Sequence, residues 1–210
     1  MAREEQRMRS EQVRRAILDI ATEMGIREGF DAVSIRKIIH QMNYSTGVVY
    51  HHFKDRQEII DAIEEAESRR LHEMIAALQD DSKDVLANME ATFHRVMRLA
   101  FEEPEKYNLI VLRKYSRRAP ERPRWLSYLS AHLKKGMEDG LIRRMDPERA
   151  AFSVWSSFLG FHLMISQRGG LTDEEAEAMF RVQFDMIARG IERKAPPRAN
   201  EETGTGGGHS

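Results

Sequence analysis

Apolar residues recur at steps of three and four along almost the whole chain, and no stretch alternates apolar and polar residues over the length of a strand. This spacing predicts helices that each turn one apolar stripe toward a core. The first stripe contains Val13, Ile17, Ala21 and Met24, and we expect Gly29 to end its helix. The pattern therefore predicts an all-α fold.

Two short helices are expected after Gly29. Ser34 is a good N-cap for a helix that turns Ile35 and Ile38 inward. Residues 43–45 are typical of a turn, and a further helix should run from about residue 45 to residue 53. Two short helices joined by a tight turn indicate a helix-turn-helix unit.

A long helix should begin at Asp55, because Asp55 and Glu58 have the spacing of a capping box. Its apolar stripe continues to about Asp80, so the helix should be ~40 Å long. A helix of this length is typical of a connector between two bodies. Later helices are expected to start at Ser82, Pro104, Pro123, Asp146 and Thr172.

These elements divide the chain into three expected parts. Residues 1–54 should form a domain with the helix-turn-helix, and residues 55–194 a larger helical domain. Residues 195–210 are rich in Pro, Gly and small polar residues, and we expect them to be disordered.

The last two expected helices carry apolar residues on more than one side, so each needs cover on more than one side. Either they lie in the centre of the subunit's own bundle, or they pair with the same helices of a second copy. We favour the homodimer. The candidate interface residues are Val154, Trp155, Phe161, Ile165, Met179, Val182 and Met186.

Composition narrows the class of protein without naming it. The chain has no cysteine, which excludes disulfides, thiolate nucleophiles and zinc–thiolate sites. It also lacks an apolar run of the ~20 residues that a membrane span needs, so we expect a cytoplasmic protein that makes no membrane contact. The net charge of −1 does not by itself indicate a nucleic-acid partner.

The most informative stretch is YSTGVVYHHFK, residues 44–54. Adjacent helical residues are about 100° apart, so His51 and His52 cannot easily bind one metal ion, and we expect no metal and no cofactor. Val49 and Phe53 have the spacing of a buried pair. Thr46 and Tyr50 then form a separate polar and aromatic face, which suits contact with phosphates and base edges of DNA.

The same stretch resembles the DNA-binding domain of the TetR/AcrR family of bacterial transcriptional regulators. The resemblance covers about residues 10–60 and rests on the segments ILDIA at 17–21, GFDAVSI at 29–35 and STGVVYHHFKD at 45–55. It departs from the family pattern at Met42 and Asn43, where many members have Gly or Ala, and at Tyr44. The resemblance implies DNA contacts by Arg36, Tyr44, Ser45, Thr46, Gly47, Tyr50, His51, His52, Lys54 and Arg56.

The resemblance also implies a homodimer that binds a roughly palindromic, double-stranded DNA operator and is usually a repressor. A small hydrophobic or amphipathic effector in the second domain would then release it. Candidate pocket residues from the middle helices are Phe93, Met97, Tyr107, Val111, Tyr115, Trp125, Leu129, His132, Phe158 and His162. For each of them, ordinary core packing is the competing interpretation.

Other functions stay open as alternatives. Six basic residues between Arg113 and Arg124 suit either a solvated loop or an anionic effector such as a fatty acid or acyl-CoA. An enzyme is not expected, because the chain has neither a G-x-S-x-G motif nor the carboxylate pair of a glycosidase. A helical adaptor that binds only protein would leave the polar face at Thr46 and Tyr50 unexplained.

Overall fold

A computed structural model of the chain describes residues 2–113 and 124–193. This part of the chain is all-α, as the periodicity predicts. Its long and short α-helices are α1 (Ala2–Glu28), α2 (Ile35–Met42), α3 (Thr46–His52), α4 (Arg56–Leu78), α5 (Val85–Glu102), α6 (Pro104–Tyr107), α8 (Arg124–Glu138), α9 (Pro147–Gln167) and α10 (Asp173–Ile191). A 3-10 turn, η1, covers Phe30–Ala32, and a π-helical segment, η2, covers Asn108–Leu112.

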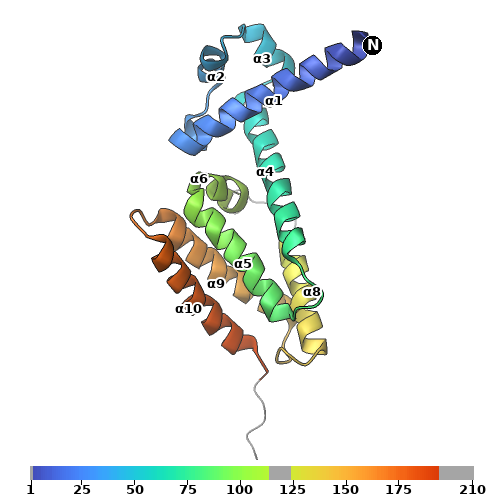
Figure 1. Cartoon of the computed structure of the whole chain (residues 1–210), viewed down its shortest axis with the longest axis vertical. Coiled ribbons are helices and arrows are strands. Elements are labelled where there is room, and N and C mark those ends of the chain that lie inside the picture. Colours follow the sequence, from blue (N-terminus) through green and yellow to red (C-terminus); the bar gives the residue numbers. More distant parts are fainter. Residues whose placement is uncertain (1, 114–123, 194–210) are drawn as a thin grey trace, which may run out of the picture.

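Helices α1, α2 and α3 lie at one end of the molecule (Figure 1), and their buried side chains belong to a core that continues along α4 to α5, α6 and η2. Ile17, Ala21, Ile38 and Val49 are completely buried in it, so the predicted inward stripes are confirmed. A Cβ atom at Gly25 of α1 would overlap the ring of Phe30, which explains a glycine within this helix. The close approach brings η1 against α1 and sets the direction in which α2 begins.

Helix α4 runs from the α1–α3 unit to the other helices (Figure 1). Asp55 is its N-cap, accepts a hydrogen bond from the Glu58 amide at 2.9 Å, and so confirms the predicted start. The Glu58 carboxylate accepts in return from the Lys54 amide at 2.8 Å. With 23 residues, the helix is about 35 Å long.

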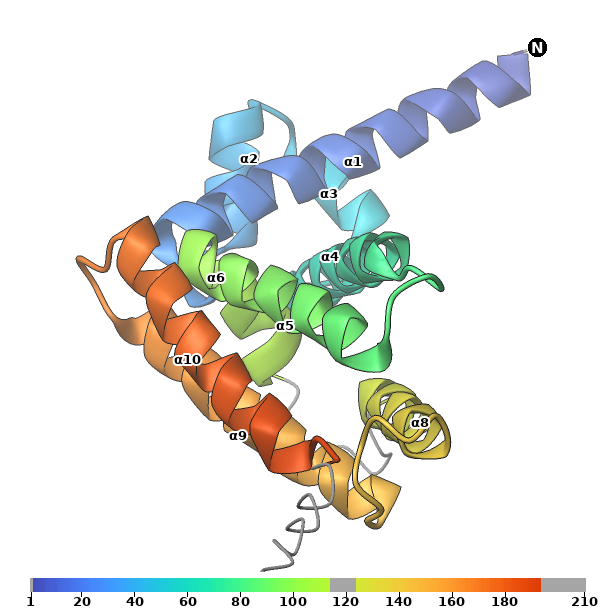
Figure 2. The ribbon, with the colours of Figure 1, turned by 60° about the horizontal axis from the view of Figure 1, so that its bottom comes forward.

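Helices α5, α8, α9 and α10 form a second core, in which α9 packs against the other three. Figure 2 shows α9 and α10 side by side, with α5 and α8 on one side of the pair. The capping box at Thr172 and Glu175 begins α10, and the Asp146 cap followed by Pro147 begins α9, both as predicted.

Two details of the second half differ from the sequence prediction. The cap of α5 is Asp84, whose Oδ1 accepts from the Ala87 amide at 2.8 Å, while the Ser82 hydroxyl donates to Asp80 at 2.6 Å. Ser82 is thus used by the preceding turn, and the helix begins two residues later than expected. The helix that starts at Pro104 changes to π-helical geometry after Tyr107.

Candidate DNA-binding and effector sites

Helix α3 presents one continuous polar face to solvent. Thr46, Gly47, Tyr50 and His51 are exposed, and Tyr50 is 53% exposed although its ring is large. Val49 and Phe53, on the opposite side, are 0% and 1% exposed. The two faces expected for this stretch are therefore both present, and the outward one offers hydroxyl and imidazole groups to a partner.

The turn before α3 adds further polar groups beside this face. Asn43 adopts the left-handed conformation with φ 55°, which asparagine tolerates better than most residues. The departure from glycine at this position is therefore compatible with a tight turn. Tyr44 and Ser45 follow it and are exposed, and the Ser45 hydroxyl makes no capping hydrogen bond of its own.

The two adjacent histidines have different surroundings. His51 is exposed, whereas His52 is partly buried, and the two rings meet edge to face at 5.1 Å. Burial lowers the pKa of His52, and the charges of His51 and Arg14 lower it further. His52 is thus favoured in its neutral form, able to donate one hydrogen bond and accept another. Among the described residues no group of three or more His, Asp or Glu could hold a metal ion.

Basic side chains flank the α3 face. Arg36 and Lys54 are exposed, in line with the phosphate contacts expected of them. Arg36 also lines a hollow of about 390 Å³ between α1 and α2, where Lys37 pairs with Glu28 at 2.8 Å. The hydrogen bonds of Glu28 to Lys37 and Arg27 lower the pKa of its carboxyl to about 2. Glu28 therefore keeps its negative charge between these cations throughout the neutral range.

Arg56, for which the resemblance implies a phosphate contact, makes two hydrogen bonds inside the protein. Its Nε donates to the Val33 carbonyl and its Nη2 to the Phe30 carbonyl, both at 2.7 Å. These bonds use two of the five N–H donors of the guanidinium, so the structure gives Arg56 a structural role and its phosphate contact stays a prediction. The bonds attach the first turn of α4 to the loop before α2.

We expect Arg56→Ala to lower the free energy of unfolding by about 2–3 kcal/mol, because two charge-assisted hydrogen bonds are lost. The matched control is Arg69→Ala, which removes an exposed pair to Glu65 on the same helix and should cost at most about 0.5 kcal/mol. Urea unfolding followed by circular dichroism measures both. A structural Arg56 also predicts an unchanged salt dependence of DNA binding, whereas the loss of one phosphate contact would reduce that slope by about one.

Most of the candidate pocket residues come together in the second core. The rings of Phe93 and Phe158 stack at 3.7 Å, and the Tyr107 and Phe158 rings each lie 5.8 Å from that of His162. Trp125 reaches this cluster through Trp155, at 3.8 Å. Met97 and Leu129 are also buried in this core, whereas Val111 is buried, together with Tyr107, in the first core beside it. In this arrangement the residues fill one another's space, so the core is closed.

Two candidates do not join this cluster. His132 is only partly buried, lies on the ring of Tyr128, and its Nδ1 is 2.9 Å from the Tyr128 carbonyl oxygen. This local contact holds it on the outer part of α8, which corrects its assignment to the pocket. Tyr115 lies outside the described residues.

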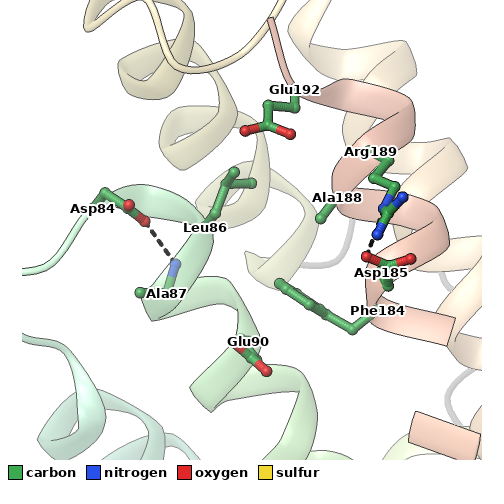
Figure 3. Close-up of a pocket in the computed structure, with 9 residues that line it drawn as sticks. All are labelled: Asp84, Leu86, Ala87, Glu90, Phe184, Asp185, Ala188, Arg189 and Glu192. Atoms are coloured by element: carbon green, nitrogen blue, oxygen red, sulfur yellow. Dashed lines mark hydrogen bonds and ion pairs between the residues drawn. The ribbon is translucent and has the colours of Figure 1, made fainter. Parts of the chain in front are cut away.

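An open hollow of about 620 Å³ lies elsewhere, between the start of α5 and the end of α10 (Figure 3). Its labelled charged groups are mostly acidic, and the Arg189 among them pairs with Asp185 at 2.7 Å. None of the candidate pocket residues lines it. The effector pocket predicted from the sequence and this surface hollow therefore lie in different parts of the second domain.

The basic cluster between Arg113 and Arg124 is described only at its first side chain. Arg113 lies 3.5 Å from Glu64 and 3.7 Å from Asp61, both on α4. The other side chains of the cluster, and the tail at 195–210, lie outside the described part of the chain. Where it is described, the cluster is paired with protein carboxylates.

The outer face of α9 differs from the expected one. Val154 and Ile165 are each 4% exposed and pack inside the subunit's own core, which corrects their assignment to a dimer interface. Phe152 and Met164, which were not predicted, are 63% and 70% exposed. Apolar residues cover well over half of the circumference of α9, so the apolar pattern alone does not distinguish its two faces.

The remaining interface candidates lie at or near the surface. Val182 and Met186 on α10 are 61% and 68% exposed, and Trp155, Phe161 and Met179 are partly buried. No described helix is long and apolar enough to cross a membrane.

The architecture and the outward face of α3 define a helix-turn-helix protein of the DNA-binding class, in which the second helix of the motif is free to enter the major groove. Comparison with known proteins agrees with this class. Residues 17–63 match the family model described as bacterial regulatory proteins, tetR family. Residues 17–63 thus form the DNA-binding domain of a TetR-family transcriptional regulator.

Relatives extend the likeness beyond the first domain. The chain is 25% identical over 189 residues to the HTH-type transcriptional repressor AcnR of Corynebacterium efficiens, which covers 86% of this chain and 93% of that protein. A TetR-family regulator from Pectobacterium atrosepticum has a similar structure, with a TM-score of 0.68 at 19% identity over 90% of this chain and 99% of the other. The ketosteroid regulator KstR2 of Mycobacterium tuberculosis has a TM-score of 0.65 at 17% identity, over 86% and 95%. These structures share the fold of both halves.

Proposed function

We propose that the protein is a homodimeric repressor that binds a roughly palindromic operator through α3 of each copy. A small hydrophobic or amphipathic effector would release it. In this proposal residues 1–54 bind DNA, and residues 55–194 bind the effector and dimerise. The observation that carries the proposal is the exposed Thr46–Tyr50–His51 face, within a segment that matches a family of DNA-binding regulators. The repressor name of the Corynebacterium relative supports the direction of control.

The homodimer is supported by an exposed apolar surface on α9 and α10. We call it the α9–α10 patch and define it by Phe152, Ser156, Gly160, Leu163, Met164, Val182 and Met186, all exposed. The Gln183 amide donates to the Ser157 hydroxyl at 2.9 Å, so the two halves of the patch adjoin at this seam. No described helix covers this side of the pair (Figure 2). A second copy would bury these side chains, and the small residues of α9 would let the helices approach closely.

Effector release requires that a change in the second domain reaches α3, and α4 is attached at its first turn and again near its middle. Arg56 joins its first turn to the DNA-binding unit. Further along, Glu64 pairs with Arg113, and Glu67 pairs with Lys106 of α6 at 3.6 Å. An effector that favours another position of α6 and η2 would therefore shift α4 and change the separation of the two α3 helices. It weakens DNA binding by its differential affinity for the two states.

An anionic lipid-type effector, bound through the basic cluster from Arg113 to Arg124, is the alternative. Arg113 supports it poorly, because its nearest charged groups are the carboxylates of Asp61 and Glu64. The pairing favours an uncharged effector.

A gel shift with the DNA upstream of the protein's own gene tests the DNA-binding face. We expect His51→Ala and Tyr50→Phe each to weaken binding about tenfold, since each removes a contact worth roughly 1–2 kcal/mol. Both side chains are exposed, so helicity and subunit association should be unchanged. The control is His72→Ala, an exposed histidine on α4 that should leave the affinity as in the wild type. Unchanged binding by both α3 variants would show that another surface contacts the DNA.

A further inference from the structure

His162 of α9 is a polar side chain in an apolar place. It is 0% exposed, and neither of its ring nitrogens makes a hydrogen bond of normal geometry. Burial lowers the pKa of the imidazole to about 3, and the nearby backbone of Phe93 opposes this shift only in part. The ring is therefore neutral at physiological pH, with one N–H donor and one nitrogen acceptor available. Such groups destabilise a core unless something satisfies them.

Aromatic rings surround this imidazole. Tyr107, Phe158 and Phe161 each have ring centres 5.8 Å from it. Phe158 continues to Phe93, and these two rings are stacked at 3.7 Å with only 9° between their planes. A flat molecule inserted between two parallel rings would stack on both of them. The shape of the cluster thus suits a planar ligand with a polar group at the His162 end.

The segment beside the cluster has a second buried polar atom without a hydrogen bond. Asn108 Oδ1 has no such partner, and Asn108 follows Tyr107 at the first residue of the π-helix η2. A π-helical turn contains an extra residue relative to an α-helix and is frequent at functional sites. A segment of this kind next to a closed core provides a local rearrangement that could open the space between Phe93 and Phe158.

Charge distinguishes between classes of ligand. The basic residues that border the second domain's interior already have carboxylate partners. Arg98 pairs with Glu102, Asp173 and Glu177, Lys106 with Glu67 and Glu103, and Arg113 with Asp61 and Glu64. Arg95 of α5 has no such pair among the described residues, but it donates to Met74 Sδ of α4 at 3.4 Å. A buried carboxylate on the ligand would thus meet a neutral imidazole and three cations that are already paired, which is unfavourable.

We propose that His162 is the polar anchor of the effector site, and that this site takes uncharged, planar, mainly apolar molecules that carry a hydroxyl or carbonyl group. The inference rests on the proposed effector-controlled function and specifies its ligand. The ligand lies between the rings of Phe93 and Phe158, and its polar group makes a full hydrogen bond to His162, whose ring has only a weak interaction with the Phe93 backbone in the free protein. Phe93 and Phe158 determine the specificity for planar ligands, because only a flat molecule can stack between their rings.

Isothermal titration calorimetry with three probes of one shape tests this assignment: 2-naphthol, naphthalene and 2-naphthoate. We expect 2-naphthol to bind the full-length protein at least tenfold more tightly than naphthalene, and 2-naphthoate to bind most weakly. His162→Phe should lose the preference for 2-naphthol over naphthalene, so that the ratio of the two affinities falls to about one. His162→Leu serves the same purpose if the larger ring disturbs folding, which circular dichroism checks.

The matched control is His132→Phe, because His132 lies outside the cluster and its change should leave 2-naphthol binding as it is. The assignment is overturned if 2-naphthoate binds as tightly as 2-naphthol. It is also overturned if both His162 variants keep the preference for 2-naphthol, or if 2-naphthol does not bind the wild type. Since the calorimetry contains no DNA, these outcomes bear on the ligand alone, and the gel shift with the α3 variants bears separately on the regulator function.

Discussion

Replacing both Met164 and Val182 with glutamate is expected to convert the protein into a monomer. These side chains are 70% and 61% exposed in one subunit and lie on the two helices of the α9–α10 patch. In the proposed homodimer each glutamate would be buried against an apolar surface, at a cost of several kcal/mol per charge. Operator binding should weaken at least ~100-fold. In a dimer, once one α3 has bound its half-site, the second α3 is held at a high effective concentration near the other half-site, and a monomer has no such second helix.

Size-exclusion chromatography with light scattering measures the mass of this variant, and a gel shift measures its affinity. Met8→Glu is the control for subunit association, since Met8 is 56% exposed on α1, far from α9 in Figure 1. That variant should keep the wild-type mass. A double glutamate variant that keeps the mass of a dimer would exclude the α9–α10 patch as the interface, and a monomeric wild type would exclude the homodimer.

The second large effect is expected at Gly47, where stability and DNA binding should change in opposite directions. A Cβ added to Gly47 meets no atom within 4 Å, and the residue lies in the first turn of α3 without a positive φ. The fold therefore does not require glycine here. Gly47→Leu should raise the free energy of unfolding by up to about 0.5–1 kcal/mol, because leucine is the better helix former.

DNA would occupy the space that is open in the free protein. If the backbone at Gly47 approaches a phosphate, a leucine side chain holds the two apart, and several neighbouring contacts weaken together. We expect at least ~100-fold weaker operator binding, which corresponds to about 2.7 kcal/mol. Gly169→Leu is the control, since that glycine also has open surroundings but lies between α9 and α10. Wild-type affinity in Gly47→Leu would place the DNA away from this turn.

Local patterns were enough to predict the helices and most of their ends. The caps at Ser34, Asp55 and Thr172 depend on residues within three positions of one another, so a short window contains the whole interaction. The same window misleads where two good caps compete. Ser82 and Asp84 are both suitable, and the hydrogen bond of Ser82 to Asp80 leaves the helix start to Asp84.

The outward polar face of α3 was also predictable, because all the residues that determine it lie within one short helix. Within one short helix, the inward position of Val49 and Phe53 settles which side Thr46 and Tyr50 occupy. The effector cluster was predictable only in part. The rings of Phe93, Phe158 and His162 come together as expected, but the outward position of His132 depends on its contact with Tyr128.

Periodicity alone thus predicts an all-α chain, and the motifs at residues 17–21, 29–35 and 45–55 add a resemblance to one family of DNA-binding regulators. Tertiary contacts decide the rest. Arg56 has a structural role that its local sequence does not show, because the carbonyls of Phe30 and Val33 that it binds lie more than twenty residues earlier. Likewise, apolar residues cover well over half of the circumference of α9, so only the helices packed against it determine that Val154 is core and Met164 is surface. When apolar residues cover most of the circumference of a helix, its sequence does not show which side is buried.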